Sequence, residues 1–296
     1  MIDNPLVSVI MNCYNSDTYL KEAIESVLNQ TYQNWEIIFW DNQSTDNSAK
    51  IVKSYNDKRV KYFYAPKFTP LGEARNLAID KADGEWIAFL DCDDLWNRDK
   101  LKISFEELEK YNDKNNVSLI YSQTEIIDSN NYIIDKVNKS ISGDIHNKLL
   151  IDGNFITFSS IIVKKDVLIK RGKIDNNLKY CEDYDVLLKI TRDYWAIGIN
   201  KYLTSYRVHN NNISSKKYYD NNIEVIEFLK DYVVVHNICS NKIKYNIFLN
   251  NSYRVAYLIY KLFSHKEFQK IVPLVIKYPL YTISSPYVII HRKLKR

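Results

Sequence analysis

Short apolar runs alternate with amphipathic segments through the first hundred residues of this chain of 296 residues. Helical spacing of apolar side chains predicts helices over residues 17–28, 47–55 and 73–81. Four apolar runs predict strands: Leu6–Met11, which is typical of a strand buried on both faces, and then Trp35–Trp40, Val60–Ala65 and Trp86–Leu90. Strands joined through helices of this length require crossover connections, so the pattern predicts an α/β fold with a mostly parallel, Rossmann-like sheet flanked by helices.

The pattern changes after residue 100. We expect a helix over 98–114, a hairpin of strands 117–127 and 132–137, and later a helix at 183–194 and a strand at 196–208. From residue 218 the chain reads as helices only, after a polar linker at 210–217. We therefore expect a first half of a catalytic domain in residues 1–100, a second half in 101–215, and a C-terminal helical region in 216–296.

The charge balance excludes some classes of protein. The net charge is 41 − 36 = +5, too small for a protein that binds nucleic acid by neutralising phosphates. None of the four cysteines forms a C-x-x-C pair, which favours reduced thiols in a cytoplasmic protein. No signal peptide is expected, and no apolar run reaches the ~18 residues of a membrane-spanning helix.

Acidic residues follow two of the expected strands. Asp41 follows the second strand, and Asp91, Asp93 and Asp94 follow the fourth. Because the carboxyl ends of parallel strands meet at one edge of the sheet, both groups should lie on the same rim. Clustered carboxylates suit a hard divalent cation, Mn²⁺ or Mg²⁺, that also binds substrate phosphates. The alternative is an acidic turn in which Asp94 only caps the following helix.

Several motifs in this order together resemble the family 2 glycosyltransferases, which have the GT-A fold. A weaker match continues at Glu182–Asp185 and Tyr206–His209. The resemblance depends on the spacing of the whole set, since each piece alone is common. The motifs that carry it are Leu6–Asn15, Leu20–Gln30, Trp35–Asp46, Gly72–Asn76 and Gly84–Asp94.

The resemblance implies where a nucleotide-sugar donor binds. Asp41 would bind the uracil of a UDP-sugar, and Asn12 and Tyr14 would border the base. Asp91 would face the ribose, and Arg75 would lie near the nucleotide. The residues themselves leave an alternative for Arg75, an ion pair with an acidic neighbour on its own helix. The loop after Asp41 departs from the family, because residues 42 and 43 are Asn and Gln where many members have Asp and Gly.

The resemblance also implies a metal site. Asp93 matches the carboxylate that holds Mn²⁺ or Mg²⁺ on the donor diphosphate, with Asp94 beside it. His209 matches a late histidine that completes the site. A lone histidine is as often an ordinary surface or core residue, so both interpretations of His209 stay open here.

In the same way, Asp183 of the Glu-Asp motif would be the catalytic base, with Glu182 and Arg207 supporting the acceptor side. The base would remove a proton from the acceptor hydroxyl as this attacks the anomeric carbon from the face opposite the leaving group. A single displacement of this kind inverts the anomeric centre. The alternative role for Asp183 is a carboxylate that only stabilises a helix N-terminus.

These inferences predict a metal-dependent inverting glycosyltransferase. It would move one sugar from a UDP-sugar to a hydroxyl of a surface-glycan or lipid-linked saccharide. Absence of a Q-x-x-R-W motif favours a single addition over processive synthesis. One alternative is a sugar-nucleotide nucleotidyltransferase, although residues 12–18 lack the glycine and lysine of a phosphate loop. Another is a non-catalytic sugar-nucleotide-binding partner subunit.

The basic residues concentrate at the C-terminus. Residues 261–296 hold eight Lys or Arg and one acidic residue, Glu267. Mixed with apolar residues, this composition fits a segment lying on the anionic inner face of the cytoplasmic membrane. It equally fits a helix packed on the catalytic domain with a solvated basic end. The sequence leaves the two interpretations open.

Overall fold

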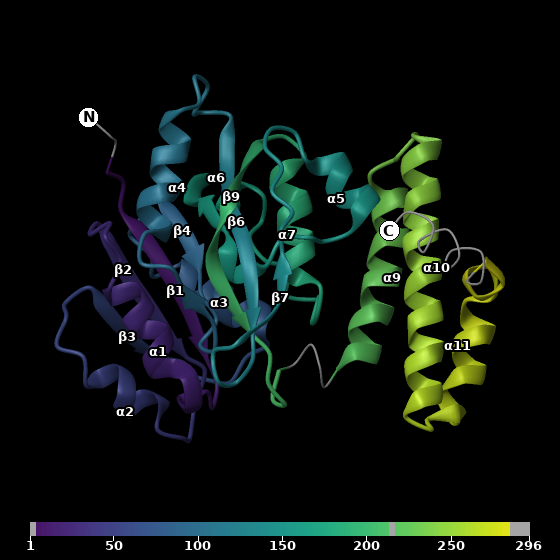
Figure 1. Cartoon of the computed structure of the whole chain (residues 1–296), viewed down its shortest axis with the longest axis horizontal. Helices are drawn as coiled ribbons and strands as arrows, with labels where there is room; N and C mark the ends of the chain where they lie inside the picture. Colours follow the sequence, from purple (N-terminus) through teal and green to yellow (C-terminus); the bar gives the residue numbers. More distant parts are fainter. Residues whose placement is uncertain (1–3, 213–216, 285–296) are drawn as a thin grey trace. The chain divides into compact units, whose positions relative to one another are not determined.

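The computed structural model describes residues 4–212 and 217–284. These residues form two compact units (Figure 1). The first unit comprises residues 1–146 and 155–210, and the second comprises residues 147–154 and 211–296. Most of the halves expected at 1–100 and 101–215 belongs to the first unit, but residues 147–154 and those from 211 onward belong to the second.

The first unit begins with the expected alternation of strands and helices. Each apolar run forms a strand because its β-branched and aromatic side chains fit a pleated surface; the first, second and fourth runs are buried, whereas the third forms a partly exposed strand at the edge of the sheet. The elements of this part are β1 (Val7–Cys13), α1 (Asp17–Leu28), β2 (Trp35–Asp41), α2 (Ser48–Lys53), β3 (Val60–Tyr64), α3 (Leu71–Ile79) and β4 (Trp86–Phe89).

The remaining elements of the first unit add antiparallel strands. They are β5 (Leu95–Trp96), α4 (Lys100–Glu109), β6 (Val117–Ile127), β7 (Ile133–Val137), a 3₁₀ turn (Phe158–Ser160), β8 (Ile162–Lys164), α6 (Lys165–Lys170), α7 (Glu182–Thr191) and β9 (Trp195–Arg207). The short strand β5 and the 3₁₀ turn were not predicted from the sequence.

One sheet carries all of these strands. Its order is β3-β2-β1-β4-β8-β6-β9-β5, with β7 paired to β6. The strands β1 to β4 pair in parallel, as the alternation predicted. Beyond β4 the sheet is mixed: β8 is antiparallel to β4 and β6, whereas β9 is parallel to β6. The predicted β6–β7 hairpin is confirmed.

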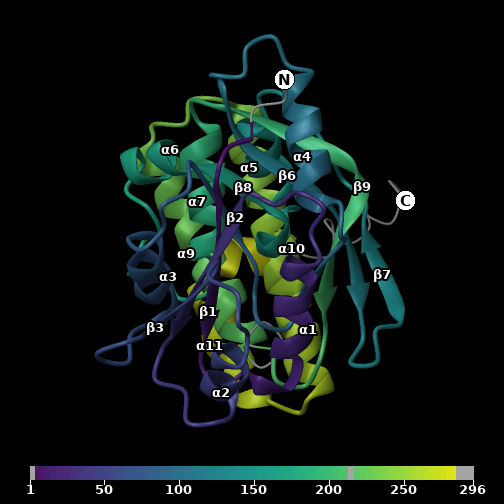
Figure 2. The same ribbon diagram turned by 90° about the vertical axis from the view of Figure 1, so that its left-hand side faces the viewer.

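Helices cover both faces of the sheet (Figure 2). Alternate β1 residues, Val7, Val9 and Met11, belong to an apolar core with buried side chains of α1 and α4. The intervening residues face the side where α3 packs on β1 and β2. Gly84 precedes β4, and a Cβ there would lie 2.7 Å from the backbone of Leu6 and Ser8, so only glycine permits this approach.

The second unit is helical. It contains α9 (Tyr218–Val235), α10 (Asn241–Ser264), a 3₁₀ turn (Phe268–Lys270) and α11 (Ile271–Lys277), together with most of α5 (His146–Asp152). A separate apolar core joins the helices through Ile226, Val255, Leu258, Leu262, Leu274 and Tyr278. Among the described residues no helix is both long and apolar enough to cross a bilayer.

Candidate active site

Parallel pairing of β1 with β2 and β4 brings the ends of these strands to one edge of the sheet, as predicted. Asn12 lies opposite Trp40, and Cys13 lies opposite Asp41. The thiol of Cys92, in the acidic loop after β4, donates to the carbonyl of Asn12 at 3.2 Å. The polar residues predicted after three different strands therefore lie together on one rim of the first unit.

Asp94 anchors the acidic loop, residues 91–94, to the protein interior. This fully buried carboxylate accepts hydrogen bonds from the Ser159 hydroxyl and, at 2.9 Å, from the backbone N–H of Arg207. Burial and the nearby charges of Asp93 and Asp91 raise its pKa well above the usual range. Asp94 does not cap the following helix: α4 begins at Lys100, and the residue before it is Asp99.

Arg207 is a second fixed point of the loop. Its guanidinium is fully buried and donates from Nε to the backbone carbonyl of Asp93 at 2.8 Å. It also pairs with Glu22 of α1 at 3.0 Å and lies 4.3 Å from the ring centroid of Tyr19. The side chain therefore holds the acidic loop against α1. These contacts give Arg207 a structural role in the loop, and none of them bears on the expected role on the acceptor side.

Asp93 and His209 meet at the edge of this loop. Their Oδ2 and Nε2 atoms are 2.8 Å apart. Burial, followed by the charge of Asp91, raises the pKa of the Asp93 carboxyl, and the His209 hydrogen bond opposes that shift. Across the described ranges no three His, Cys, Asp or Glu side chains are grouped as a metal site.

Arg75 of α3 connects two acidic segments. Its buried guanidinium lies 3.1 Å from Asp91 Oδ1 and 2.9 Å from Glu182 Oε1. It also stacks 4.4 Å from the ring centroid of Phe158. The alternative of a partner on its own helix is wrong, because both carboxylate partners come from other elements, 16 and 107 residues away. Arg75 therefore ties the loop after β4 to the start of α7.

Two carboxylates begin α7. Burial raises the pKa of Glu182 to about 7, although Arg75 acts in the opposite direction. Burial likewise raises the pKa of Asp183, which accepts from the Tyr184 N–H at 2.7 Å. Cys181 occupies the N-cap position, and no side chain caps this helix. Asp183 is thus in the first turn, where the helix dipole favours a carboxylate, without being the cap.

The far end of the rim carries two exposed aromatic rings. Tyr14, just after β1, meets Phe68 edge-to-face with the ring centroids 4.9 Å apart. Both rings are more than half exposed, at 52% and 55%. Sequence reasoning missed Phe68, which lies in a loop between β3 and α3 and has no motif of its own. Exposed rings of this kind suit stacking with a nucleobase.

Asn12 and Asp41 lie near the ends of the paired strands β1 and β2. The amide nitrogen of Asn12 is buried and finds no hydrogen-bond acceptor among the residues described. Asp41 is fully buried and accepts from the Ser44 N–H at 2.7 Å and from the Tyr62 hydroxyl at 2.6 Å. An uncompensated buried donor costs free energy, so Asn12 is a position where a bound polar group would be stabilising.

Comparison with known proteins decides the family. Residues 8–172, more than half of the chain, match the family described as Glycosyl transferase family 2. The chain belongs to glycosyl transferase family 2. The family resemblance and the enzyme class predicted from the sequence, a glycosyltransferase, are therefore confirmed, and inversion is typical of this family.

Two characterised or provisionally assigned relatives match most of the chain. The first is the Escherichia coli UDP-Glc:alpha-D-GlcNAc-diphosphoundecaprenol beta-1,3-glucosyltransferase WfgD, 31% identical over 79% of this chain and 94% of the relative. The second is the Bacillus subtilis putative teichuronic acid biosynthesis glycosyltransferase TuaG, 31% identical over 72% of this chain and 83% of the relative.

Solved structures share the fold. Residues 1–349 of S. aureus TarS, in complex with UDP-GlcNAc, give a TM-score of 0.64 at 19% identity, covering 87% of this chain and 72% of that one. The mannosyltransferase PcManGT from Pyrobaculum calidifontis, in complex with GDP-Man and Mn²⁺, gives 0.61 at 17% identity, covering 97% and 86%. The predicted GT-A fold is confirmed.

Proposed function

We propose that this family 2 glycosyltransferase transfers one sugar, with inversion, from a UDP-sugar to a hydroxyl of a lipid-linked or surface-glycan saccharide. The observation that carries the proposal is the Arg75 bridge. It fixes the loop of Asp91 and Asp93, the proposed donor side, relative to the start of α7. That helix presents Asp183, the proposed base. Preorganised groups of this kind are what a displacement reaction requires.

Asp183 is assigned as the base that receives the proton of the acceptor hydroxyl. The acceptor oxygen forms the new bond to the anomeric carbon, and the bond from that carbon to the diphosphate oxygen breaks. The electron pair of the broken bond leaves with UDP. Burial raises the pKa of Asp183 and so makes its carboxylate a better proton acceptor than an exposed aspartate.

The donor is proposed to be a UDP-sugar. The printed name of WfgD specifies UDP-Glc, and TarS was crystallised with UDP-GlcNAc. One ring of the Tyr14–Phe68 pair would stack on the uracil, and the buried Asn12 amide would donate a hydrogen bond to an acceptor atom of the nucleotide. Asp41 would lie next to the uracil ring. Its two oxygens each accept one hydrogen bond, from the Ser44 N–H and the Tyr62 hydroxyl, and each retains a lone pair that could accept from uracil.

Asp93, His209 and the donor diphosphate would hold Mn²⁺ or Mg²⁺. Two protein ligands with phosphate and water oxygens suit these cations, and burial beside Asp91 makes a cation favourable at Asp93. When bound, the metal would neutralise charge on the leaving diphosphate. For Asp94, which the resemblance placed beside the metal, we propose a supporting role instead, because the side chain is fully buried and accepts hydrogen bonds from Ser159 and Arg207.

Calorimetry tests the donor class. UDP, GDP, CDP and dTDP are titrated into the full chain with and without Mn²⁺. We expect UDP to bind at least tenfold more tightly than the other three, and only with the metal. Preference for another diphosphate would overturn the UDP assignment. An assay of UDP release from UDP-glucose and UDP-GlcNAc, with and without a lipid-diphosphate-linked acceptor, then tests transfer.

Family membership decides against a nucleotidyltransferase. The remaining alternative, a sugar-nucleotide-binding subunit without catalysis, would bind UDP but show no acceptor-dependent release.

We also propose that α11 and the residues after it contact an anionic membrane. Leu274 and Tyr278 pack in the helical core, so this segment does pack on other helices. Its other side is apolar and exposed: Val272, Ile276, Leu280 and Ile283 are each between 62% and 78% exposed. Val272 and Ile276 lie one turn apart on α11, and Leu280 and Ile283 lie one turn apart in the helical residues 279–284 that follow a break at Tyr278. The excess of Lys and Arg over Glu267 in residues 261–296 complements an anionic surface.

The membrane proposal predicts that the double variant Ile276→Asp, Leu280→Asp binds vesicles at least tenfold more weakly. The new carboxylates would desolvate on insertion and repel anionic lipid. Co-sedimentation with phosphatidylglycerol and phosphatidylcholine vesicles measures the change, with wild type preferring phosphatidylglycerol. Val234→Asp is the matched control, because Val234 is an equally exposed apolar residue of α9. Equal binding by wild type and the double variant would disprove the membrane contact.

A further inference from the structure

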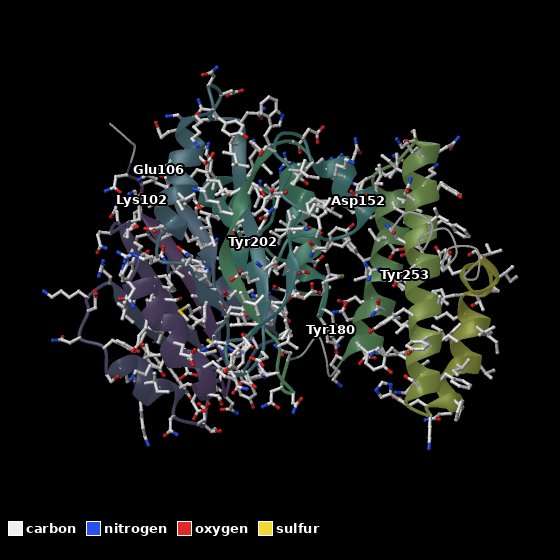
Figure 3. The ribbon with its side chains drawn as sticks, in the orientation of Figure 1. Lys102, Glu106, Asp152, Tyr180, Tyr202 and Tyr253 are labelled. Carbon is white, nitrogen blue, oxygen red and sulfur yellow. The ribbon has the colours of Figure 1, made fainter. Side chains whose placement is uncertain are left out.

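A half-open cavity of about 290 Å³ lies at the surface of the helical unit. Its wall is built from the end of α5 and from α9 and α10. Figure 3 labels two of the bordering residues, Asp152 at the end of α5 and Tyr253 on α10. All residues that line it belong to the helical unit, and none of the donor or base residues described above is among them.

The walls of this cavity are tied together by specific hydrogen bonds. The amide of Asn250 on α10 donates to the carbonyl of Ile151 in α5 at 2.8 Å. Arg254 Nη1 donates to Asn222 Oδ1 of α9 at 3.2 Å. Gly153 follows α5 with a φ of +81°, and a Cβ there would lie 3.8 Å from Arg254 Nη2. The turn thus requires a backbone conformation that glycine adopts without strain, directly beside the guanidinium.

The chemistry of the lining points to a neutral, hydroxyl-rich ligand. The lining combines the amides of Asn222 and Asn250, which can donate and accept, with the Asp152 carboxylate, which accepts, and the Arg254 guanidinium, which donates; the amides and the guanidinium also hydrogen-bond within the unit. Tyr253, with a neighbouring tyrosine on the same helix, offers ring surface for an apolar sugar face. A phosphate site would instead concentrate cations, whereas here one arginine shares the cavity with a carboxylate.

We propose that this cavity is a saccharide subsite that takes one sugar residue of the acceptor glycan. The volume supports this size of ligand, because drug-sized ligands occupy pockets of roughly 300–1,000 Å³ and a single pyranose is smaller. The identity of the occupant as part of the acceptor rests on the proposed function. Binding of a sugar to the cavity does not depend on it.

The test uses saturation-transfer NMR on the full chain with the methyl glycosides of glucose, galactose, mannose and N-acetylglucosamine. We expect at least one glycoside to bind, and its signal to fall at least fivefold in Tyr253→Ala and in Asn222→Ala. Tyr245→Ala is the matched control, a tyrosine of α10 that is exposed and does not line the cavity. Circular dichroism melting verifies that each variant is folded.

Three results would overturn the subsite: no glycoside binds wild type, the two variants bind as wild type does, or inorganic phosphate binds and displaces the glycoside. UDP titration of the same samples keeps this test separate from the donor proposal, because the variants should bind UDP as wild type does. Displacement of the bound monosaccharide by an acceptor oligosaccharide would support the acceptor as the natural ligand. If only free monosaccharides compete for the cavity, it is a site for free sugar and the acceptor assignment is refuted.

Discussion

Asp183→Asn is expected to lower the rate of sugar transfer about 10²–10⁴-fold, the usual contribution of a general base. Asparagine keeps the size of the side chain and can accept from the Tyr184 N–H, but it cannot take the proton of the acceptor hydroxyl. Donor affinity should change little, because the substitution leaves Asp91, Asp93 and the Arg75 bridge intact. Single-turnover kinetics and UDP calorimetry separate the two effects.

The pH profile gives a second readout for Asp183. The base works only when deprotonated, so transfer should fall as pH falls through its pKa. Burial raises that pKa, and the acid limb of kcat/KM should therefore lie above the range of an exposed aspartate. Asp193→Asn, an exposed carboxylate just after α7 that pairs with Arg171, is the control and should retain the wild-type profile. If the Asp183→Asn variant kept more than a tenth of the wild-type rate of sugar transfer, the base role would be refuted.

The parallel half of the fold follows from local pattern. The runs at Leu6 and Trp35 are both apolar and short, and the helix between them buries one side, so the order of elements places Asp41 and Asp91 at the same edge of the sheet. The second half was less readable, because β8 has only three residues and is antiparallel to both neighbours. Its position depends on pairing partners far away in sequence.

The site shows the same division. The family resemblance implied that Asp93 and His209 belong to one site, and their side chains are in contact. It could not predict that Arg75 joins Glu182 across 107 residues, or that Ser159 holds Asp94. These contacts arise from tertiary packing, and neither partner carries a local signal.

A buried lysine is a further feature without a sequence signature. Lys100 is fully buried, donates to the Ser160 carbonyl at 2.8 Å, and has its pKa lowered to about 7 by that burial. It begins α4 and fixes the 3₁₀ turn that also carries Ser159. Nothing in the sequence distinguishes Lys100 from an exposed lysine, so its role in supporting the acidic loop is visible only in the structure.

Asp93→Ala should abolish metal-dependent binding of UDP, which is the second large effect. Asp93 is the partly exposed carboxylate of the loop that contacts His209, and the metal would have no equivalent ligand after its removal. Calorimetry should show UDP affinity in Mn²⁺ falling to the value that wild type gives in excess EDTA. Asp135→Ala, which removes an exposed carboxylate from β7, is the control and should bind UDP as wild type does.

Asp94→Ala should behave differently, and the contrast separates ligand from support. Removing Asp94 leaves the buried Ser159 hydroxyl and Arg207 N–H without their acceptor, which costs roughly 1–3 kcal/mol of stability and lowers the melting temperature. Removing Asp93 instead relieves its repulsion with Asp91, so the metal-free protein should melt no lower than wild type. The two variants change the net charge equally, so a difference between them reports on which carboxylate was removed. If Asp93→Ala retains Mn²⁺-dependent UDP binding, the metal site must lie elsewhere.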